Sequence, residues 1–284
     1  MNILVTGASG QLGSEIRSIS SYYRTYFFFF CSSKELNVCD HTEVFNFIET
    51  NKIDIIINCA AYTAVDKAES NAVLADAVNH QAVANLAKIA VSKTIKLVHV
   101  STDYVFDGTN YQPYTENDVP NPQSVYGVTK LAGEEAMLKA NPPNSIIIRT
   151  SWVYSKFGNN FVKTMLRLAT ERTELNIVAD QIGSPTNALD LAYVIFKILP
   201  QLENENVEVF HYSNDGVCSW YDFAYTIFEK SNLEIKLNPI ATKQYPTPAK
   251  RPYFSIMSKE KIKAEYGIKT KYWTLSLSDF LLNK

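Results

Sequence analysis

The stretch Asn2-Ile3-Leu4-Val5-Thr6-Gly7-Ala8-Ser9-Gly10-Gln11-Leu12-Gly13 decides the fold class of this chain. It opens with a short run rich in apolar and β-branched residues, which predicts a buried strand, and a helical pattern with Leu12, Ile16 and Ile19 on one side follows. The glycines between the two have the spacing G-x-x-G-x-x-G. The first permits a tight turn, the second lets the backbone approach a pyrophosphate, and the third allows close packing of helix against strand. Free N–H groups at the start of the helix would face the anion, so the stretch predicts a nucleotide-binding strand–turn–helix.

Strand and helix patterns alternate through the first half of the chain. Each predicted strand is apolar without alternation, which is typical of a parallel sheet covered on both faces. The pattern therefore predicts an α/β protein with a Rossmann-type doubly wound parallel sheet. Further strands are expected at 27–31, 53–58, 95–101 and 145–150, and helices after the N-cap Asp40 and at 71–91 and 123–140.

After Thr150 the pattern loosens. Helices are predicted at 159–170, 189–199 and 220–230, Gly183 and Pro185 break the segment 180–187, and four prolines make 238–252 irregular. We expect residues 1–150 to form a dinucleotide-binding domain whose sheet can recruit a later segment. Residues 151–284 are expected to form a smaller, mostly helical substrate-binding lobe, with some segments returning to the core.

Composition narrows the class of protein. The 284 residues carry 27 Lys and Arg against 29 Asp and Glu, and this balance argues against a nucleic-acid partner. The longest apolar run, 26–31, is too short to span a bilayer, and the N-terminus carries no secretory pattern. The four cysteines match no zinc spacing. We expect a cytoplasmic monomer or homodimer with reduced thiols and no membrane partner.

The end of the second strand bears on the choice of cofactor. It reads Cys31-Ser32-Ser33-Lys34, with no carboxylate at the strand end to bind a ribose 2′-hydroxyl or repel a 2′-phosphate. Two hydroxyls and a lysine favour NADPH. Glu35 lies close enough to keep NADH possible.

Tyr126 and Lys130 stand at i and i+4, so they share one helix face. A free tyrosine has a pKa near 10, and a nearby ammonium is expected to lower that pKa. The pair could then give a proton to a carbonyl oxygen as hydride reaches the carbon. Ser101-Thr102 ends the preceding predicted strand and supplies a candidate orienting hydroxyl.

The glycine spacing, the Tyr–Lys pair and this hydroxyl together resemble the extended short-chain dehydrogenase/reductase superfamily. Longer strings resemble one family within it, the dTDP-4-dehydrorhamnose reductases. The strings span nearly the whole chain in order. They are 58–69 (NCAAYTAVDKAE), 101–108 (STDYVFDG), 149–154 (RTSWVY), 158–162 (GNNFV), 180–186 (DQIGSPT) and 250–252 (KRP).

The resemblance implies NAD(P)H-dependent reduction of the 4-keto group of a dTDP-6-deoxyhexulose to dTDP-L-rhamnose. It implies catalytic roles for Thr102, Tyr126 and Lys130. Cofactor contacts are expected at Gly7, Gly10, Gln11, Leu12, Gly13, Ser32, Ser33, Lys34, Asn37, Val38, Ala61, Tyr62 and Thr63, and from Tyr126 and Lys130. Substrate contacts are expected at Val65, Thr102, Asp103, Tyr104, Trp152, Asn160, Phe161 and Arg251.

Some of these residues have a plainer interpretation. Trp152 could serve packing alone, Asn160 and Phe161 could only begin a helix, and Arg251 could be a surface charge. Asn37 stands where the family keeps an aspartate. His99 lies in a predicted buried strand and is expected to be a satisfied structural histidine.

Some family members bind magnesium through carboxylates at a dimer contact. Glu15 and Asp190 stand near the matching places, but Ala188 occupies a position where another acid would be expected. We therefore predict no metal, and we expect Glu15 and Asp190 to be solvated helix charges.

Two other functions remain open. The regulatory subunit of methionine adenosyltransferase resembles these reductases without their activity, but this chain keeps the catalytic set. A nucleotide-sugar epimerase or 4,6-dehydratase shares the superfamily pattern. A dehydratase would want Asp-Glu after the catalytic threonine, and Asp103-Tyr104 follows here.

Overall fold

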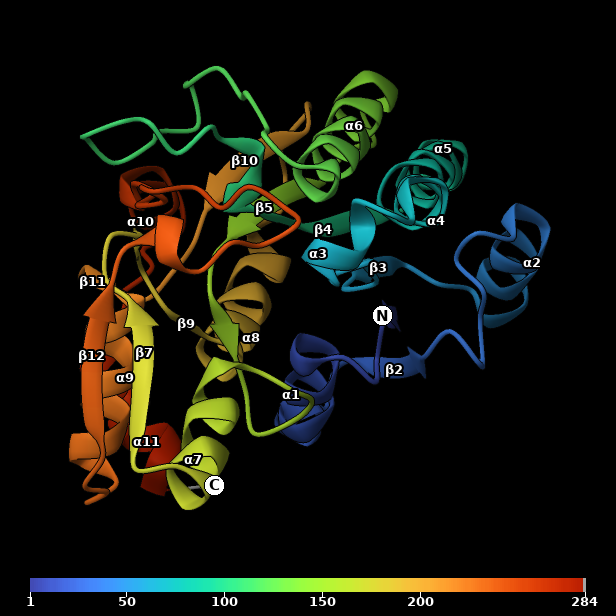
Figure 1. The fold of residues 1–284 in the computed structure, drawn as a ribbon. Coiled ribbons are helices and arrows are strands. Elements are labelled where there is room, and N and C mark those ends of the chain that lie inside the picture. The colour runs from blue at the N-terminus through green and yellow to red at the C-terminus, as the bar shows by residue number, and fades with distance from the viewer. Residues whose placement is uncertain (283–284) are drawn as a thin grey trace.

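A six-stranded parallel sheet forms the centre of the computed structural model, which describes residues 1–282 (Figure 1). The strand order is β10-β5-β4-β3-β1-β2, so the first five strands follow the doubly wound order 2-1-3-4-5. All five predicted strands are present, and the predicted fold class is confirmed. The strands are β1 (Asn2–Thr6), β2 (Phe27–Cys31), β3 (Ile55–Asn58), β4 (Lys96–Thr102), β5 (Ile146–Thr150) and β10 (Glu208–His211).

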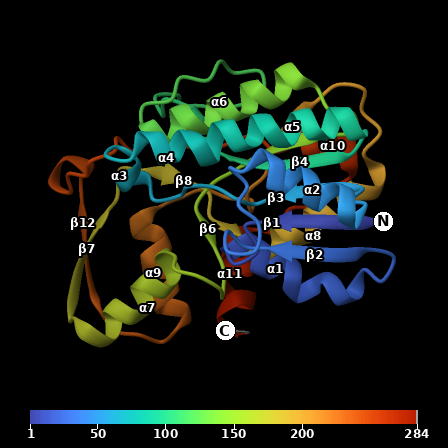
Figure 2. The same ribbon diagram turned by 90° about the vertical axis from the view of Figure 1, so that its right-hand side faces the viewer.

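Helices cover both faces of the sheet, which explains why its strands are apolar throughout. One face packs against α1 and α8, with Ile3 and Val5 in its core. The opposite face packs against α2, α5 and α6, with Leu4 and Ile56 in its core (Figure 2). The bounds are α1 (Gln11–Ile19), α2 (His41–Asn51), α5 (Ala82–Lys93), α6 (Val125–Ala140) and α8 (Ala188–Ile198). As predicted, Asp40 caps α2, accepting a hydrogen bond from the Glu43 N–H at 2.9 Å.

Residues beyond 150 complete the sheet. Strand β10 pairs with β5 at the sheet edge, and α8 and α10 (Glu260–Tyr266) supply residues to the core on the α1 face of the sheet. The chain thus leaves the sheet after β5 and returns to it. The division of the chain at residue 150 remains a prediction.

A smaller lobe lies beside the sheet (Figures 1 and 2). It has its own apolar core, to which Tyr154, Phe223 and Leu277 contribute. Its main elements are α7 (Phe161–Glu171), β7 (Glu174–Val178), α9 (Trp220–Lys230), β12 (Lys236–Ile240) and α11 (Trp273–Leu282). Short pairs add β6 (Val153–Tyr154) with β9 (Thr186–Asn187), and β8 (Ile182–Gly183) with β11 (Cys218–Ser219).

Two sequence expectations for this lobe are partly wrong. The segment 238–252 was expected to be irregular throughout. This holds for 241–252, which contain only the short turn η5, but residues 238–240 belong to β12, which pairs in parallel with β7. Pro239 is tolerated because β12 is an edge strand with one neighbour, and proline lacks only the N–H that such an edge can spare. The segment 180–187 was expected to be a loop, and it holds β8 and β9.

The predicted helix over 71–91 is interrupted by a π-helical turn. It comprises α4 (Ala72–Asp76), the π turn η2 (Ala77–Gln81) and α5. Such turns insert one residue into the helical repeat and often occur at functional sites. The remaining short elements are η1 (Ser20–Tyr22), α3 (Val65–Ala68), η3 (Asp103–Val105), η4 (Leu199–Gln201) and η5 (Thr242–Gln244).

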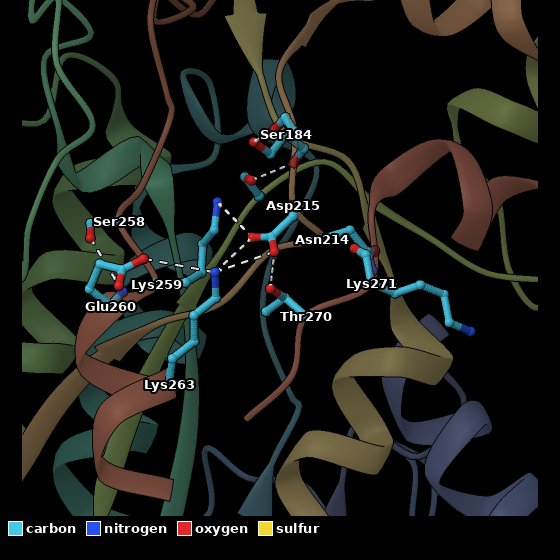
Figure 3. A network of polar contacts seen from close by, with 11 residues as sticks. Ser184, Asn214, Asp215, Ser258, Lys259, Glu260, Lys263, Thr270 and Lys271 are labelled. Atoms are coloured by element: carbon cyan, nitrogen blue, oxygen red, sulfur yellow. Dashed lines mark hydrogen bonds and ion pairs between the residues drawn. The ribbon is translucent and has the colours of Figure 1, made fainter. Parts of the chain in front are cut away.

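A network of polar side chains around Asp215 connects the segment that leads into α11 to α10 (Figure 3). Asp215 accepts hydrogen bonds from Lys263 at 3.2 Å and from the Thr270 hydroxyl, and Lys259 lies 3.9 Å away. The Trp273 N–H also donates to the backbone carbonyl of Asp215. The network therefore joins the segment after β10 to α10 and to the segment that leads into α11.

Candidate active site

A cleft of about 900 Å³ opens at the carboxyl ends of the parallel strands. Loops after β1, β2, β3, β4 and β5 line it, together with Tyr126 and Lys130 of α6. Ligands of open α/β sheets bind at this edge. Most of the predicted site residues line the cleft. They are Gly7, Gly10, Gln11, Leu12, Ser33, Asn37, Val38, Ala61, Tyr62, Thr63, Val65, Thr102, Asp103, Tyr104, Tyr126, Lys130 and Trp152.

The glycine loop needs glycine for steric reasons. Gly7 has a φ of +62°, and a Cβ there would lie 2.6 Å from the backbone N of Ala60. A Cβ on Gly13 would lie 2.5 Å from the carbonyl oxygen of Gly7, so Gly13 lets α1 pack against the loop. Helix α1 starts after Gly10 with no side-chain cap and no acidic residue in its first turn. Its N–H groups are therefore available to an anion in the cleft.

The loop after β2 holds a carboxylate close to the predicted 2′-phosphate position. Glu35 accepts a hydrogen bond from the Ser32 N–H at 2.6 Å, and the hydrogen bonds from Ser32 lower the pKa of Glu35. Ser33 lines the cleft, whereas Lys34 is exposed and is not among the lining residues. Arg17 of α1 also influences the Glu35 carboxylate, so a second cation is close to this loop.

The catalytic candidates lie together. The Thr102 hydroxyl donates to Asp103 at 3.0 Å, and Tyr104 and Tyr126 pack edge to face with ring centroids 5.4 Å apart. The net pKa of Tyr126 is raised to about 12, because burial outweighs the lowering effect of a hydrogen bond with Thr102. The sequence argument expected Lys130 to lower this pKa below its usual value, and that expectation is wrong because desolvation dominates. The phenol therefore keeps its proton at neutral pH.

Asp103 is the other unusual acid of the cleft. It is 2% exposed, and its Oδ2 atom has no hydrogen-bond partner among the described residues. Burial raises the pKa of Asp103 to about 6. A buried oxygen of this kind, on the wall of the cleft, suits a hydroxyl donor on a ligand.

Trp152 is held in an unusual conformation at the far wall of the cleft. Its backbone φ is +48°, and its indole stacks on Trp220 with ring centroids 3.5 Å apart and planes 8° apart. Gly183 lies close to the same ring, because a Cβ there would be 2.5 Å from Trp152 Cε2. The string at 180–186 thus makes room for the tryptophan of the string at 149–154.

Comparison with known proteins now adds to this geometry. The family model of the RmlD substrate binding domain matches residues 1–284. The chain belongs to this family. The dTDP-4-dehydrorhamnose reductase of Aggregatibacter actinomycetemcomitans is 41% identical to it over 286 residues, covering 98% of this chain and 97% of that protein.

Solved structures agree. A dTDP-4-dehydrorhamnose reductase from Clostridium acetobutylicum superposes with a TM-score of 0.94 at 41% identity, covering 100% of both chains. One from Bacillus anthracis, in complex with NADP, gives a TM-score of 0.95 at 36% identity, covering 100% of this chain and 99% of that chain. The predicted resemblance to this family of reductases is confirmed, and the NADP complex agrees with the predicted cofactor class.

Three of the predicted substrate contacts are not among the residues that line the cleft. Asn160 caps α7, accepting from the Lys163 N–H at 3.1 Å, and donates to Gln11 of the glycine loop at 3.0 Å. Phe161 packs on Trp220 with centroids 4.6 Å apart. Asn160 thus contacts Gln11, which lines the cleft, and Phe161 packs on Trp220, which stacks on the cleft residue Trp152. Direct substrate contact by either residue remains a prediction.

Arg251 is the third. Its Nη2 donates to Asp66 of α3 at 2.7 Å, and its buried Nη1 has no partner among residues 1–282. The adjoining Pro252 packs against Gly108, which has a φ of +74°. The strings at 58–69, 101–108 and 250–252 therefore meet in space. Arg251 is not the free surface charge of the plainer interpretation.

The expectation of solvated charges at Glu15 and Asp190 is wrong. Glu15 is 1% exposed and accepts from the Ser155 hydroxyl at 2.7 Å, because α1 packs where the small lobe begins. Asp190 accepts from Asn214 at 2.8 Å and from the Ser276 hydroxyl. Within residues 1–282 no group of three or more His, Cys, Asp or Glu side chains is placed to hold a metal ion.

Sequence reasoning missed Asn79. The π turn η2 aims this fully buried side chain at the 61–63 segment, where it accepts from the Tyr62 N–H at 2.8 Å and donates to the Tyr62 carbonyl at 3.2 Å. It also donates to Thr129 of α6 at 3.2 Å. Asn79 therefore ties the cofactor-side loop to the helix that carries Tyr126. A buried asparagine in an alanine-rich helix was the available signal.

Proposed function

We propose that this protein reduces the 4-keto group of dTDP-4-dehydro-6-deoxy-L-mannose and produces dTDP-L-rhamnose, with NADPH as the preferred reductant and NADH possible. The observation that carries the proposal is the presence of Thr102, Tyr126 and Lys130 in one cleft with the glycine loop. Relatives that are about 40% identical over nearly the whole chain bear the name of this reductase.

The chemistry follows from the state of each group. NADPH, when bound, supplies the hydride that reaches the carbonyl carbon. Tyr126 gives its phenolic proton to the carbonyl oxygen, so the ketone becomes an alcohol. The phenol is protonated at neutral pH, and burial raises its pKa further, to about 12, so Tyr126 enters the reaction with its proton in place. Thr102 orients the reacting oxygen through its hydroxyl.

The remaining contacts would hold the nucleotide sugar. Asp103 offers a buried carboxyl oxygen to a sugar hydroxyl, and Trp152 offers a flat apolar face to the sugar ring. Val65 and Tyr104 line the same wall. Arg251, with an unpartnered Nη1, has the donor geometry to bind a diphosphate. The ion pair with Asp66 would orient that guanidinium.

A direct assay tests the proposal. Purified protein is mixed with NADPH or NADH and the 4-keto-rhamnose nucleotide, and, in parallel, with its 4-keto-glucose precursor. The proposal expects oxidation of the cofactor with the first sugar only, and formation of dTDP-L-rhamnose. An epimerase or a dehydratase would instead retain its nicotinamide through turnover, and a non-catalytic subunit would oxidise none. Either of those results would contradict the proposal.

A further inference from the structure

Lys130 ends a buried chain of side chains that the reductase chemistry does not account for. Its Nζ atom lies 3.2 Å from His99 Nε2 and donates to the Val100 carbonyl at 2.7 Å. On the other side of the ring, His99 Nδ1 lies 3.0 Å from Asn58 Nδ2. Asn58, His99 and Lys130 come from β3, β4 and α6 and are at most 2% exposed.

The hydrogen bonds of Asn58 determine which way its amide points. Its Oδ1 accepts from the Thr6 hydroxyl at 2.6 Å and from the Ala60 backbone N–H at 3.2 Å. The Ala60 N–H can only donate, so the atom facing it must be the oxygen. The Asn58 amide nitrogen therefore faces His99 and donates to its Nδ1.

This orientation assigns the proton on the imidazole. Since Nδ1 of His99 accepts, the neutral ring carries its hydrogen on Nε2. Burial lowers the pKa of His99 well below its usual value, and the Lys130 charge lowers it further, so the ring is neutral. The Nε2–H then points at Lys130 Nζ. An ammonium has no lone pair to accept this hydrogen, whereas a neutral amine has one.

We propose that His99, held by Asn58, is a positioning residue that directs its Nε2–H at Lys130 and favours the neutral amine of that lysine. The inference rests on the catalytic role proposed for Lys130. The sequence predicted only a structural role for His99, and the proposal adds a positioning role.

The surroundings of Lys130 act with His99. Burial lowers the pKa of Lys130 to about 8, while Glu134 of α6 and Cys59 after β3 oppose this. Glu134 forms an ion pair with Arg149 of β5, with Arg149 Nη2 and Glu134 Oε2 2.6 Å apart, and this pair offsets much of the Glu134 charge. Asp103 and Tyr126, the other titratable groups of this wall, line the same cleft as Lys130.

A lysine in this state can restore the proton that the reaction consumes. After Tyr126 has given its proton to the substrate, the Lys130 ammonium, one helical turn along α6, passes a proton to the phenolate. The amine that results accepts the hydrogen bond from His99 until it takes a proton from water in the cleft. His99 stabilises that amine and so makes the transfer easier.

The unmodified protein provides the first test, with no substrate required. Nitrogen-15 NMR of labelled histidine reports which ring nitrogen of His99 is protonated. The expected result is hydrogen on Nε2 and none on Nδ1 between pH 6 and 9. Hydrogen on Nδ1 would overturn the proposal, because Nε2 would then accept from an ammonium.

Two variants provide the second test, read by carbon-13 NMR of labelled lysine, with Lys130 assigned from its absence in Lys130→Met. In His99→Gln the amide oxygen can face Lys130, and in Asn58→Asp the carboxylate takes the Nδ1–H and leaves Nε2 an acceptor. Both changes favour the ammonium, so the titration midpoint of Lys130 should rise by about one pH unit or more.

The same variants can be assayed with the keto sugar. The pH at which kcat falls on the alkaline side should rise with the Lys130 midpoint, while KM changes little.

His211→Gln is the matched control, because His211 is a buried histidine of β10 whose ring contacts Arg149 rather than Lys130. It should leave the Lys130 midpoint unchanged. Unchanged midpoints in both test variants, at wild-type melting temperature, would overturn the proposal. If instead the NMR results hold and the protein fails to reduce the keto sugar, the reductase assignment fails and the His99 assignment stands.

Discussion

Tyr126 illustrates how a single side chain obtains its reactivity from its surroundings. Desolvation raises the pKa of Tyr126, and the Thr102 hydroxyl partly offsets it. A phenol that stays protonated suits a reductase, which must donate a proton at the end of hydride transfer. The same burial would hinder the reverse reaction at neutral pH, because oxidation of the alcohol needs the phenolate.

Tyr126→Phe should keep the fold and the affinity for NADPH but reduce kcat by about 10²–10⁴-fold, since general acid catalysis contributes about that much. Steady-state kinetics on the keto sugar, with cofactor affinity from fluorescence titration, would measure both. Wild-type kcat in this variant would show that another group donates the proton.

Lys34 and Glu35 make opposite contributions to cofactor choice. Lys34→Ala removes a cation that can pair with a 2′-phosphate, so kcat/KM for NADPH should fall about 10-fold while that for NADH changes little. Glu35→Gln removes a carboxylate that repels the phosphate, so the preference for NADPH should increase. Side-by-side titrations of the two cofactors at fixed keto sugar decide this. Equal losses for both cofactors in Lys34→Ala would remove the argument for a phosphate pocket.

At the scale of elements, the cleft wall that carries Trp152 depends on a stack of rings from separate segments. Trp152 precedes β6, Trp220 and Phe223 belong to α9, and Phe161 begins α7. Phe161 stacks on Phe223 with centroids 5.5 Å apart, and it also packs on Trp220. The small lobe therefore presents Trp152 to the cleft through the packing of its own core.

Trp220→Ala should raise KM for the nucleotide sugar by up to about 10-fold, because an aromatic pair contributes about 0.5–1.5 kcal/mol beyond its buried area. Cofactor affinity should not change. Trp220→Phe keeps a ring under Trp152 and serves as the control, with a KM near that of the wild type. A KM that stays constant in Trp220→Ala would mean that Trp152 does not depend on its stacking partner or does not touch the sugar.

For the molecule as a whole, buried neutral histidines predict how stability depends on pH. Burial and the neighbouring Arg149 charge together lower the pKa of His211 to about 3. The unfolded chain protonates this histidine near pH 6.5, whereas the folded protein does so only near pH 3. The stability is therefore complete above pH 6.5 and is lost progressively as the pH falls from there to 3, by about 1.4 kcal/mol for each pH unit.

His211→Gln should reduce this acid sensitivity. The free energy of unfolding, measured with urea at pH 7 and at pH 5, should fall less between the two pH values in the variant than in the wild type. The difference should be about 1–2 kcal/mol.

Asp103 provides a test with the opposite sign. Burial raises the pKa of Asp103 to about 6, so this group destabilises the fold as the pH rises from 4 to 6. Asp103→Asn removes this effect, so the free energy of unfolding of the variant should fall more between pH 7 and pH 5 than that of the wild type. Parallel pH dependence in all three proteins would contradict both assignments.

No helix in residues 1–282 is both long and apolar enough to cross a membrane.

The small lobe and the sheet are joined by hydrogen bonds to two residues of α1. Gln11 accepts from Asn160, and Glu15 accepts from Ser155, both in the segment after β6. The glycine loop is therefore tied directly to the wall that carries Trp152.

The amino-acid sequence by itself determined the five leading strands, the glycine loop, and the candidates Thr102, Tyr126 and Lys130. These depend on patterns within a few residues, namely apolar runs, glycine spacing and the i, i+4 repeat of a helix, which act locally whatever the rest of the chain does. The resemblance to reductase strings extended the prediction to Asp103 and Trp152 without explaining why the strings belong together.

Only the tertiary structure decided what those strings do for one another. Gly183 lies against Trp152, Glu15 is buried against Ser155, and Asn58, His99 and Lys130 form one line. Each of these contacts joins residues about thirty or more positions apart in the chain. Burial and hydrogen bonding at such points arise when the sheet and the lobe pack together, and they set which groups are charged. No local pattern carries that information, since the same asparagine or histidine in water would be an ordinary polar side chain.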